Sequence, residues 1–147
     1  MLKKKALLEN SDTLIELLTA ECADLEKLLS LAQAEFAAAN QGDFERVFEI
    51  VTEREVLGER LETYNKQIAD LREKLGEAGE TVLRGDLNTR LAGLVNEILQ
   101  QDANTRPLLE AAKQESVQEN NRVEGLQRRA NAYSQEKLKG MAYSKNL

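Results

Sequence analysis

The chain has 147 residues, of which 31% are charged and 4% aromatic, with one proline, one cysteine and no histidine. The absence of histidine excludes the common zinc sites and the Ser-His and Cys-His catalytic pairs. The net charge of −6 argues against nucleic-acid binding, and no apolar run is long enough to insert into a membrane. We therefore expect a non-catalytic, all-α protein without a metal or a cofactor.

The first helix is expected over residues 11–39. Asn10, Ser11 and Asp12 are small polar residues, which commonly accept hydrogen bonds from the amides of a first helical turn. Apolar residues then recur at the three-or-four spacing of one helical face: Leu14, Leu18, Cys22, Leu25, Leu29, Ala32 and Phe36. Three leucines widen this stripe: Leu17, Leu28 and Leu31. Such a broad apolar stripe needs a broad partner surface.

The single cysteine and the N-terminal residues bear on the compartment. Cys22 has no second cysteine to pair with, and its place on the apolar stripe favours a small buried hydrophobe over a reactive thiol. Lys3 to Lys5 resemble the basic start of a signal peptide, but Glu9 and Asp12 prevent a continuous apolar run after these lysines. We expect a cytoplasmic protein.

The second helix is expected over residues 43–75. Gly42 suits the left-handed end of a helix and Asp43 caps the next one, so the short connection predicts an antiparallel return. A heptad pattern occupies this helix: Val47, Ile50, Arg54, Leu57, Leu61, Tyr64, Ile68, Leu71 and Leu75. Arg54 is the one charged residue of this pattern. It could fix the register of the helices or receive an acidic partner. Alternatively, its stem lies along the apolar seam while its guanidinium reaches water. The pattern alone favours the exposed guanidinium.

The third helix is expected from Asp86 to residue 112 or beyond. Gly76 and Gly79 mark a break, and Gly85 with Asp86 repeats the glycine and aspartate of the previous turn. The apolar face comprises Leu87, Leu91, Leu94 and Ile98, supported by Val95 and Leu99. Pro107 lacks the amide that bonds back along a helix, so it interrupts or restarts this helix.

These elements predict a body over residues 1–112 and a separate C-terminal segment over 113–147. The body is expected to be an antiparallel helical hairpin or a three-helix bundle with long, coiled-coil-like helices. It carries 13 basic and 22 acidic residues, whereas the segment carries 7 and 4. An acidic body of −9 thus precedes a basic, amphipathic and marginally ordered helix of +3, a type that often orders on a partner.

Two tyrosines stand out in this C-terminal segment. Tyr133 and Tyr143 have few large apolar neighbours in the sequence, which makes them candidate anchors for a partner's groove. Tyr133 has the alternative of packing back on the body.

The order of the parts resembles the FlgN family of flagellar export chaperones. A leucine-rich first helix precedes Gly42-Asp43-Phe44-Glu45, and Val51-Thr52-Glu53-Arg54-Glu55 then runs into the heptad helix. Asn104, followed by the pair Leu108-Leu109, extends the similarity into the third helix. The resemblance spans most of the chain, and Pro107 departs from a continuous third helix.

The resemblance implies a cytoplasmic chaperone that binds hook-associated proteins of the hook-filament junction and delivers them to export-gate components of the flagellar type III machinery. In that family the C-terminal region binds the substrate. The apolar contacts would then come from Val117, Val123, Leu126, Tyr133, Leu138 and Tyr143. Steering toward an acidic partner would come from Arg122, Arg128 and Arg129.

Two other classes of function remain open on the sequence. One is a non-catalytic coiled-coil scaffold or homodimerisation module, because a two-helix hairpin leaves apolar faces for another helix or subunit. The other is an accessory subunit of an enzyme, which would bind a catalytic chain selectively. The sequence allows a monomer or a homodimer.

Overall fold

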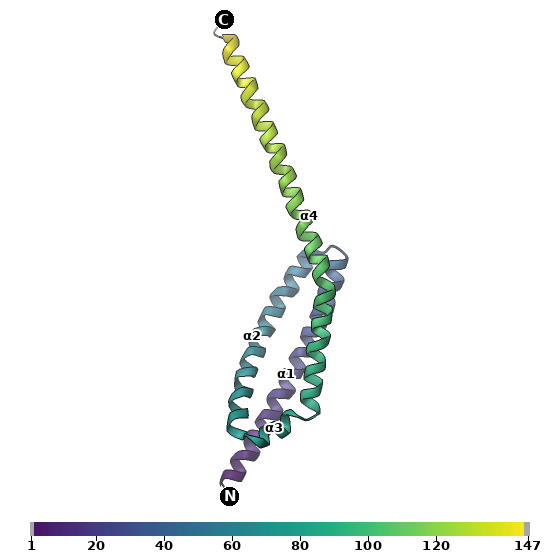
Figure 1. The fold of residues 1–147 in the computed structure, drawn as a ribbon, viewed down its shortest axis with the longest axis vertical. Coiled ribbons are helices and arrows are strands. Elements are labelled where there is room, and N and C mark those ends of the chain that lie inside the picture. The colour runs from purple at the N-terminus through teal and green to yellow at the C-terminus, as the bar shows by residue number, and fades with distance from the viewer. Residues whose placement is uncertain (1, 146–147) are drawn as a thin grey trace. The chain divides into compact units, whose positions relative to one another are not determined.

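The computed structural model describes the backbone of residues 2–145 and the side chains of residues 3–126, 128 and 129. Four helices account for nearly all of this range: α1 (Leu2–Asn40), α2 (Phe44–Leu75), α3 (Glu77–Leu83) and α4 (Asp86–Lys145) (Figure 1). No strand occurs among the described residues, so the predicted all-α class is confirmed. The chain divides into two units, Met1–Pro107 and Leu108–Leu147, which are described separately.

Helix α1 begins at Leu2 rather than near Asn10 to Asp12 as the capping residues suggest. The residues before Asn10 are mostly lysine, leucine and alanine, which have high helix propensity, so helix formation continues past the polar trio. Thr13 adapts to this interior position by donating its hydroxyl to the Glu9 carbonyl oxygen at 2.9 Å.

The turn between α1 and α2 has the predicted chemistry. Gly42 has φ +76°, a conformation that costs glycine little because it has no Cβ. The Asp43 amide donates to the Ala38 carbonyl oxygen at 2.9 Å, and the Asp43 carboxylate accepts from the Arg46 amide at 3.2 Å. Both ends of the turn are therefore satisfied, and α2 returns antiparallel to α1.

Helix α3 is a short element that the glycine pattern did not predict. Gly76 has φ +57° and its amide donates to the Arg72 carbonyl oxygen at 3.1 Å, which ends α2. A Cβ on Gly79 would lie 3.1 Å from the Leu75 Cβ. The absence of a side chain at Gly79 thus permits α3 to pack closely on the end of α2.

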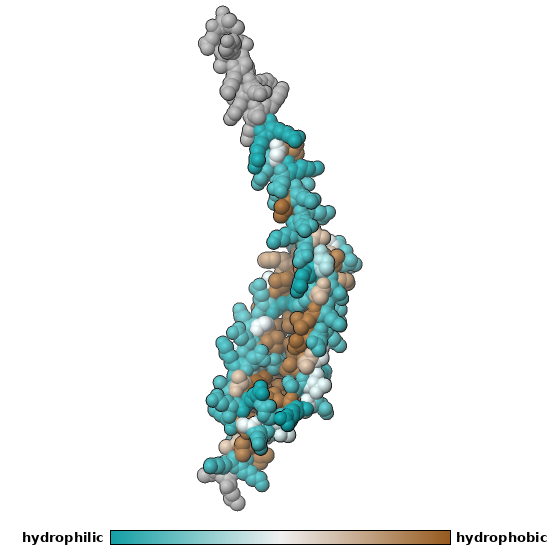
Figure 2. Space-filling view, in the orientation of Figure 1, coloured by the Kyte–Doolittle hydropathy of each residue, from teal (hydrophilic) through white to brown (hydrophobic). Residues whose placement is uncertain are grey.

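The first unit is a three-helix bundle of α1, α2 and residues 86–107 of α4, closed at one end by α3. Leu14, Leu18 and Leu75 are buried in a cluster at the end of the bundle that α3 closes. Half-buried side chains from three helices pack against them: Ile68, Leu71, Ala78, Val82, Leu83, Leu87 and Leu91. Figure 2 shows that the hydrophobic side chains of this unit concentrate between its helices. The apolar periodicity therefore identified the core.

Residues 86–107 of α4 run parallel to α1. The Cys22 thiol lies 3.6 Å from the Leu87 carbonyl oxygen, and one turn later Arg90 pairs with Glu26. Two side chains that were expected to support the packed face are exposed: Val95 and Leu99. Each follows a packed residue by one position, a rotation of about 100° that turns it toward solvent. Helix α4 continues through Pro107.

Candidate partner-binding site

The C-terminal segment exposes the apolar residues that were predicted to bind a partner, as far as the structure describes them. Val117, Val123 and Leu126 are between 43% and 54% exposed. Tyr133, Leu138 and Tyr143 lie outside the residues whose side chains are described. Monomeric proteins expose single apolar residues commonly, so the grouping of these side chains decides whether they form a surface.

The helical period divides these predicted residues between two faces. Val123 and Leu126 are three residues apart and share a face, and Arg122 and Arg129 border Leu126 within about 60°. Val117 is nine residues from Leu126, which places it about 180° away on the opposite side of the helix. Arg128 is also on the far side. We define the basic face as Arg122, Val123, Leu126 and Arg129.

Two of the three predicted arginines have local carboxylate partners. Arg122 lies 3.0 Å from Glu119, and Arg128 lies 3.8 Å from Glu124. Both pairs are solvent-exposed and have the i,i+3 or i,i+4 spacing, so each stabilises the helix by only about 0.3 to 0.5 kcal/mol. A carboxylate of a partner protein could therefore replace Glu119 or Glu124 at a small cost in free energy.

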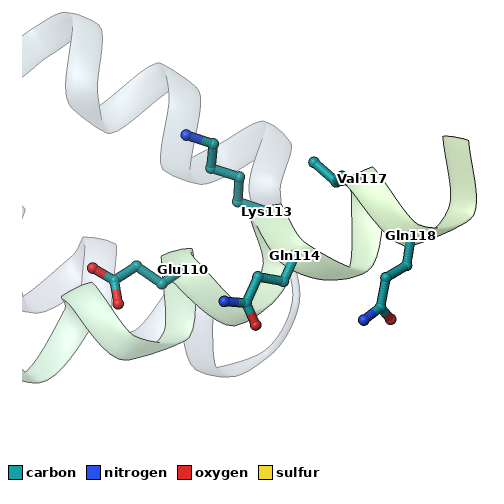
Figure 3. A pocket seen from close by; sticks show the side chains of 5 residues that line it. All are labelled: Glu110, Lys113, Gln114, Val117 and Gln118. Carbon is teal, nitrogen blue, oxygen red and sulfur yellow. The ribbon is translucent and has the colours of Figure 1, made fainter. Parts of the chain in front are cut away.

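The opposite side of this helix is predominantly polar around Val117. Figure 3 shows Val117 on α4 near Lys113, Gln114 and Gln118, with Glu110 one turn further back. A shallow depression here has all of its lining side chains on this one helix. A single helix cannot enclose a ligand, so we do not assign a small-molecule site here.

The charged residue of the α2 heptad is half-buried in an ionic cluster, which corrects the interpretation that its guanidinium reaches water. Arg54 donates to both oxygens of Asp102 on α4 at 2.8 Å, and to Glu35 on α1 at 3.3 Å. Its side chain is only 19% exposed. The hydrogen bonds that Arg54 donates to Asp102 raise the pKa of Arg54, and desolvation by burial opposes this effect. Arg54 therefore joins three helices of the bundle in one register.

A second ionic contact joins α1 to α2 at the next level of the bundle. Arg60 donates to the two carboxylate oxygens of Asp24 at 2.9 and 3.0 Å. Asp24 is buried, whereas the Arg60 side chain is half exposed. Arg60 precedes Leu61 in the sequence and lies at the edge of the heptad stripe, so the apolar pattern did not predict this pair. The contacts of Arg60 with Asp24 and of Arg54 with Glu35 and Asp102 together fix the alignment of α2 on α1 and α4.

Glu21 is buried on α1 without an ionic partner. No donor among the described residues lies within hydrogen-bond distance of its carboxylate, and burial raises its pKa above the ordinary value. No fully buried polar side-chain atom of the described residues lacks a partner, so the Glu21 carboxylate keeps some contact with the surface. The charged form of Glu21 therefore destabilises the bundle at neutral pH.

Replacing Glu21 by glutamine should raise the free energy of unfolding at pH 7 by about 1 kcal/mol, because a neutral amide is easier to bury than an unpaired carboxylate. Since the folded pKa is raised, protonation of Glu21 stabilises the wild type fully below an unfolded pKa of about 4.3. This contribution disappears as the pH rises through the folded pKa.

Urea unfolding of the two proteins should therefore differ at pH 7 and converge below about pH 4. Glu16→Gln, at an exposed position of the same helix, is the control and should change stability by less than about 0.5 kcal/mol at both pH values. A difference between wild type and Glu21→Gln that stayed constant with pH would refute a role for Glu21 ionisation.

Cys22 occupies the apolar stripe as a buried thiol. Burial raises its pKa, while Arg90 lowers it and Glu21 raises it to smaller extents. A thiol with a raised pKa is predominantly protonated at neutral pH and reacts poorly as a nucleophile. The prediction that Cys22 is a buried small hydrophobe is confirmed.

A groove between α1 and α2 is a feature that the sequence analysis missed. Its walls comprise Leu31, Val56 and Leu57 together with Lys27, Ser30 and Glu53, and its volume is about 520 Å³. Val56 is 60% exposed although it is apolar. It precedes Leu57 of the heptad by one position, so the core periodicity does not identify it. The sequence signal that could have indicated this groove is the apolar Val56 beside the heptad residue Leu57.

Phe48 adds an aromatic ring to the outer face of α2. It is 74% exposed, and Phe44 one turn earlier is also exposed. Both lie outside the heptad positions, on the side of the helix turned away from the core. Aromatic residues are enriched in protein interfaces, and such exposure is uncommon for phenylalanine. The outer face of α2 is therefore a second apolar surface.

The described part of the chain contains no cluster of three or more residues suited to hold a metal ion. None of its helices has an apolar stretch of the length and hydropathy needed to cross a bilayer. No protein-family model, curated protein or solved structure matches the chain.

Proposed function

We propose that this protein is a non-catalytic, cytoplasmic export chaperone that resembles the FlgN family. It would bind hook-associated flagellar proteins through its C-terminal segment, prevent their premature assembly and deliver them to the flagellar export apparatus. The observation that carries the proposal is the basic face, where Val123 and Leu126 are exposed beside two arginines. The proposal includes neither a nucleic-acid partner nor insertion into a membrane.

The physical requirements of such a chaperone are modest. A client protein that polymerises through terminal helices exposes apolar stripes on those helices before assembly. An amphipathic helix covers such a stripe by pairing with it, and mass action then holds the client in the unassembled state. The arginines speed encounter with an acidic client surface and make binding sensitive to salt.

The bundle would present this segment without taking part in chemistry. Its helices are aligned by the two bidentate arginine pairs, Arg54 with Asp102 and Arg60 with Asp24. The core residues of the first unit all lie within this bundle. A chain that retains the bundle but ends after Ala112 is therefore the informative variant.

Co-expression with hook-associated proteins and copurification tests the proposal. The full chain should form a stable complex with at least one of them, and the chain truncated after Ala112 should not. Leu126→Glu should weaken the complex by more than about tenfold, because it places a charge in the apolar contact. Arg128→Glu, on the other side of the helix, is the matched control and should have a small effect.

Two outcomes would contradict the proposal. A complex that survives truncation after Ala112 would remove the C-terminal segment from the binding site. The absence of any complex with hook-associated proteins would favour a coiled-coil scaffold instead. Loss of the complex on truncation supports the proposal if circular dichroism shows that the truncated chain keeps a folded bundle.

A further inference from the structure

The outward side of α2 carries two exposed phenylalanines and, further along the helix, exposed glutamates. Phe48 is 74% exposed and Phe44, one turn before it, is 43% exposed. The helical period places Glu55 and Glu59 within about 20° of Phe48, and Glu62 within about 40° of it. All three glutamates are exposed. We define the aromatic-acidic face as these five residues.

The charges along this part of α2 are mainly acidic. Residues 44–62 contain six glutamates and three arginines. Each arginine already contacts a carboxylate of the bundle: Arg46 contacts Glu49, Arg54 contacts Asp102 and Arg60 contacts Asp24. Among the described residues, no base lies within 4 Å of Glu55 or Glu59, and Glu62 is 3.6 Å from Lys66. The carboxylates closest to Phe48 around the helix are therefore available to a cation from outside.

We propose that the aromatic-acidic face binds a basic amphipathic helix of another protein. Its negative charge repels nucleic acid and anionic membrane surfaces, while its exposed rings need an apolar contact from the occupant. A basic helix with an apolar end meets both requirements. The C-terminal segment takes no part in this contact, so the proposal goes beyond the binding of a flagellar client.

The spacing along α2 defines the pattern of the occupant. Phe48 lies about 10 Å along the helix axis from Glu55 and about 16 Å from Glu59, which is two to three helical turns. The partner helix therefore carries apolar side chains over one turn and lysines or arginines two to three turns further along the same face. Each base can then reach one glutamate while the apolar side chains cover the rings.

The size of the contact sets the expected affinity. Residues 44–62 span about 27 Å of helix. A single helix laid along them covers less than the roughly 800 Å² per partner of a stable interface. We therefore expect a transient complex with a dissociation constant on the order of 10 µM at low salt. Higher salt should weaken it, because exposed charges are screened over about 8 to 10 Å.

Synthetic helical peptides test the proposal on the full chain. The matching peptide has two leucines one turn apart and three lysines two to four turns further along the same face. The control peptide has the same composition with its lysines on the opposite face. The matching peptide should bind more than about tenfold more tightly than the control. In NMR spectra it should shift the amide resonances of residues 44–62.

A substitution in the aromatic part tests the apolar contact. Phe48→Ser should weaken binding of the matching peptide by more than about tenfold, because the exposed ring is the main apolar anchor. Leu99→Ser is the matched control, since Leu99 is 60% exposed and lies on α4. It should leave the dissociation constant within about twofold of the wild type.

Charge reversal tests the acidic part. Glu55→Lys combined with Glu59→Lys should weaken binding of the matching peptide by more than about tenfold. A peptide with glutamates in place of the lysines should then shift the resonances of residues 44–62, which it should leave unchanged in the wild type. Glu9→Lys combined with Glu16→Lys makes the same change in net charge at exposed positions of α1. This control should bind the matching peptide within about threefold of the wild type.

Three results would overturn the proposal. The first is an unchanged spectrum of residues 44–62 at about 1 mM matching peptide, a hundred times the expected constant. The second is equal binding of the matching and control peptides, or of the matching peptide by wild type and Phe48→Ser. The third is a concentration-dependent shift of residues 44–62 without peptide, which would assign the face to a second copy of this chain. No client is present and every variant keeps the C-terminal segment, so these failures are distinct from failure of the chaperone proposal.

Discussion

Replacing Arg54 by methionine should lower the free energy of unfolding by about 3 kcal/mol, because the change leaves the carboxylates of Glu35 and Asp102 without their cation. Glu35 is almost fully buried, and Asp102 is about one-third exposed. Glu35 cannot recover its hydration without opening the bundle, whereas Asp102 remains partly hydrated. The loss is expected in urea unfolding followed by circular dichroism, with little change in the slope of free energy against urea.

The matched control is Arg46→Met. Arg46 also contacts two carboxylates, at 3.1 Å and 3.8 Å, but its side chain is 45% exposed. The control should therefore cost no more than about 0.5 kcal/mol. Equal losses for the two methionine variants would show that the Arg54 cluster is solvated and contributes no more than a surface pair.

A triple variant separates the cost of an unpaired charge from the value of the cluster itself. Arg54→Met combined with Glu35→Met and Asp102→Leu removes all three charges. Its stability should return to within about 1 kcal/mol of the wild type or exceed it, since buried ion pairs are often no better than apolar contacts. Loss of a single unfolding transition in this variant would indicate that the cluster serves to fix helix register.

The apolar periodicity predicted which side chains form the core and how many long helices carry them. It could not predict the partners of Arg54, because Glu35 and Asp102 are 19 and 48 residues away in the sequence. Which charges meet depends on the alignment of three helices. A local pattern contains no information on that alignment, so the heptad arginine was misinterpreted as solvent-exposed.

The candidate site illustrates a different limit. The helical period alone shows that Val117 and Leu126 face opposite ways, so grouping them by residue type joined two surfaces that a single partner helix cannot cover together. The exposure of Val56, in contrast, does not follow from the helical period. Whether an apolar residue beside the heptad is covered depends on where the third helix packs, and only the structure places α4 away from it.

Replacing Leu18 by alanine should lower the free energy of unfolding by about 3 kcal/mol, the typical cost of a cavity in a packed core. Leu18 is 1% exposed and contacts the cluster of Leu14 and Leu75, where α1, α2 and α3 meet. Leu8→Ala on the same helix is the control, since Leu8 is 60% exposed. It should cost less than about 0.5 kcal/mol.

Urea unfolding of both variants gives the measurement, and amide hydrogen exchange shows where the loss acts. Leu18→Ala should speed exchange throughout residues 14–107, because these helices share one core and open together. Exchange beyond Leu108 should change little, since that unit has none of the described core residues. Faster exchange in both units to the same extent would mean that the C-terminal helix depends on the bundle core for its stability.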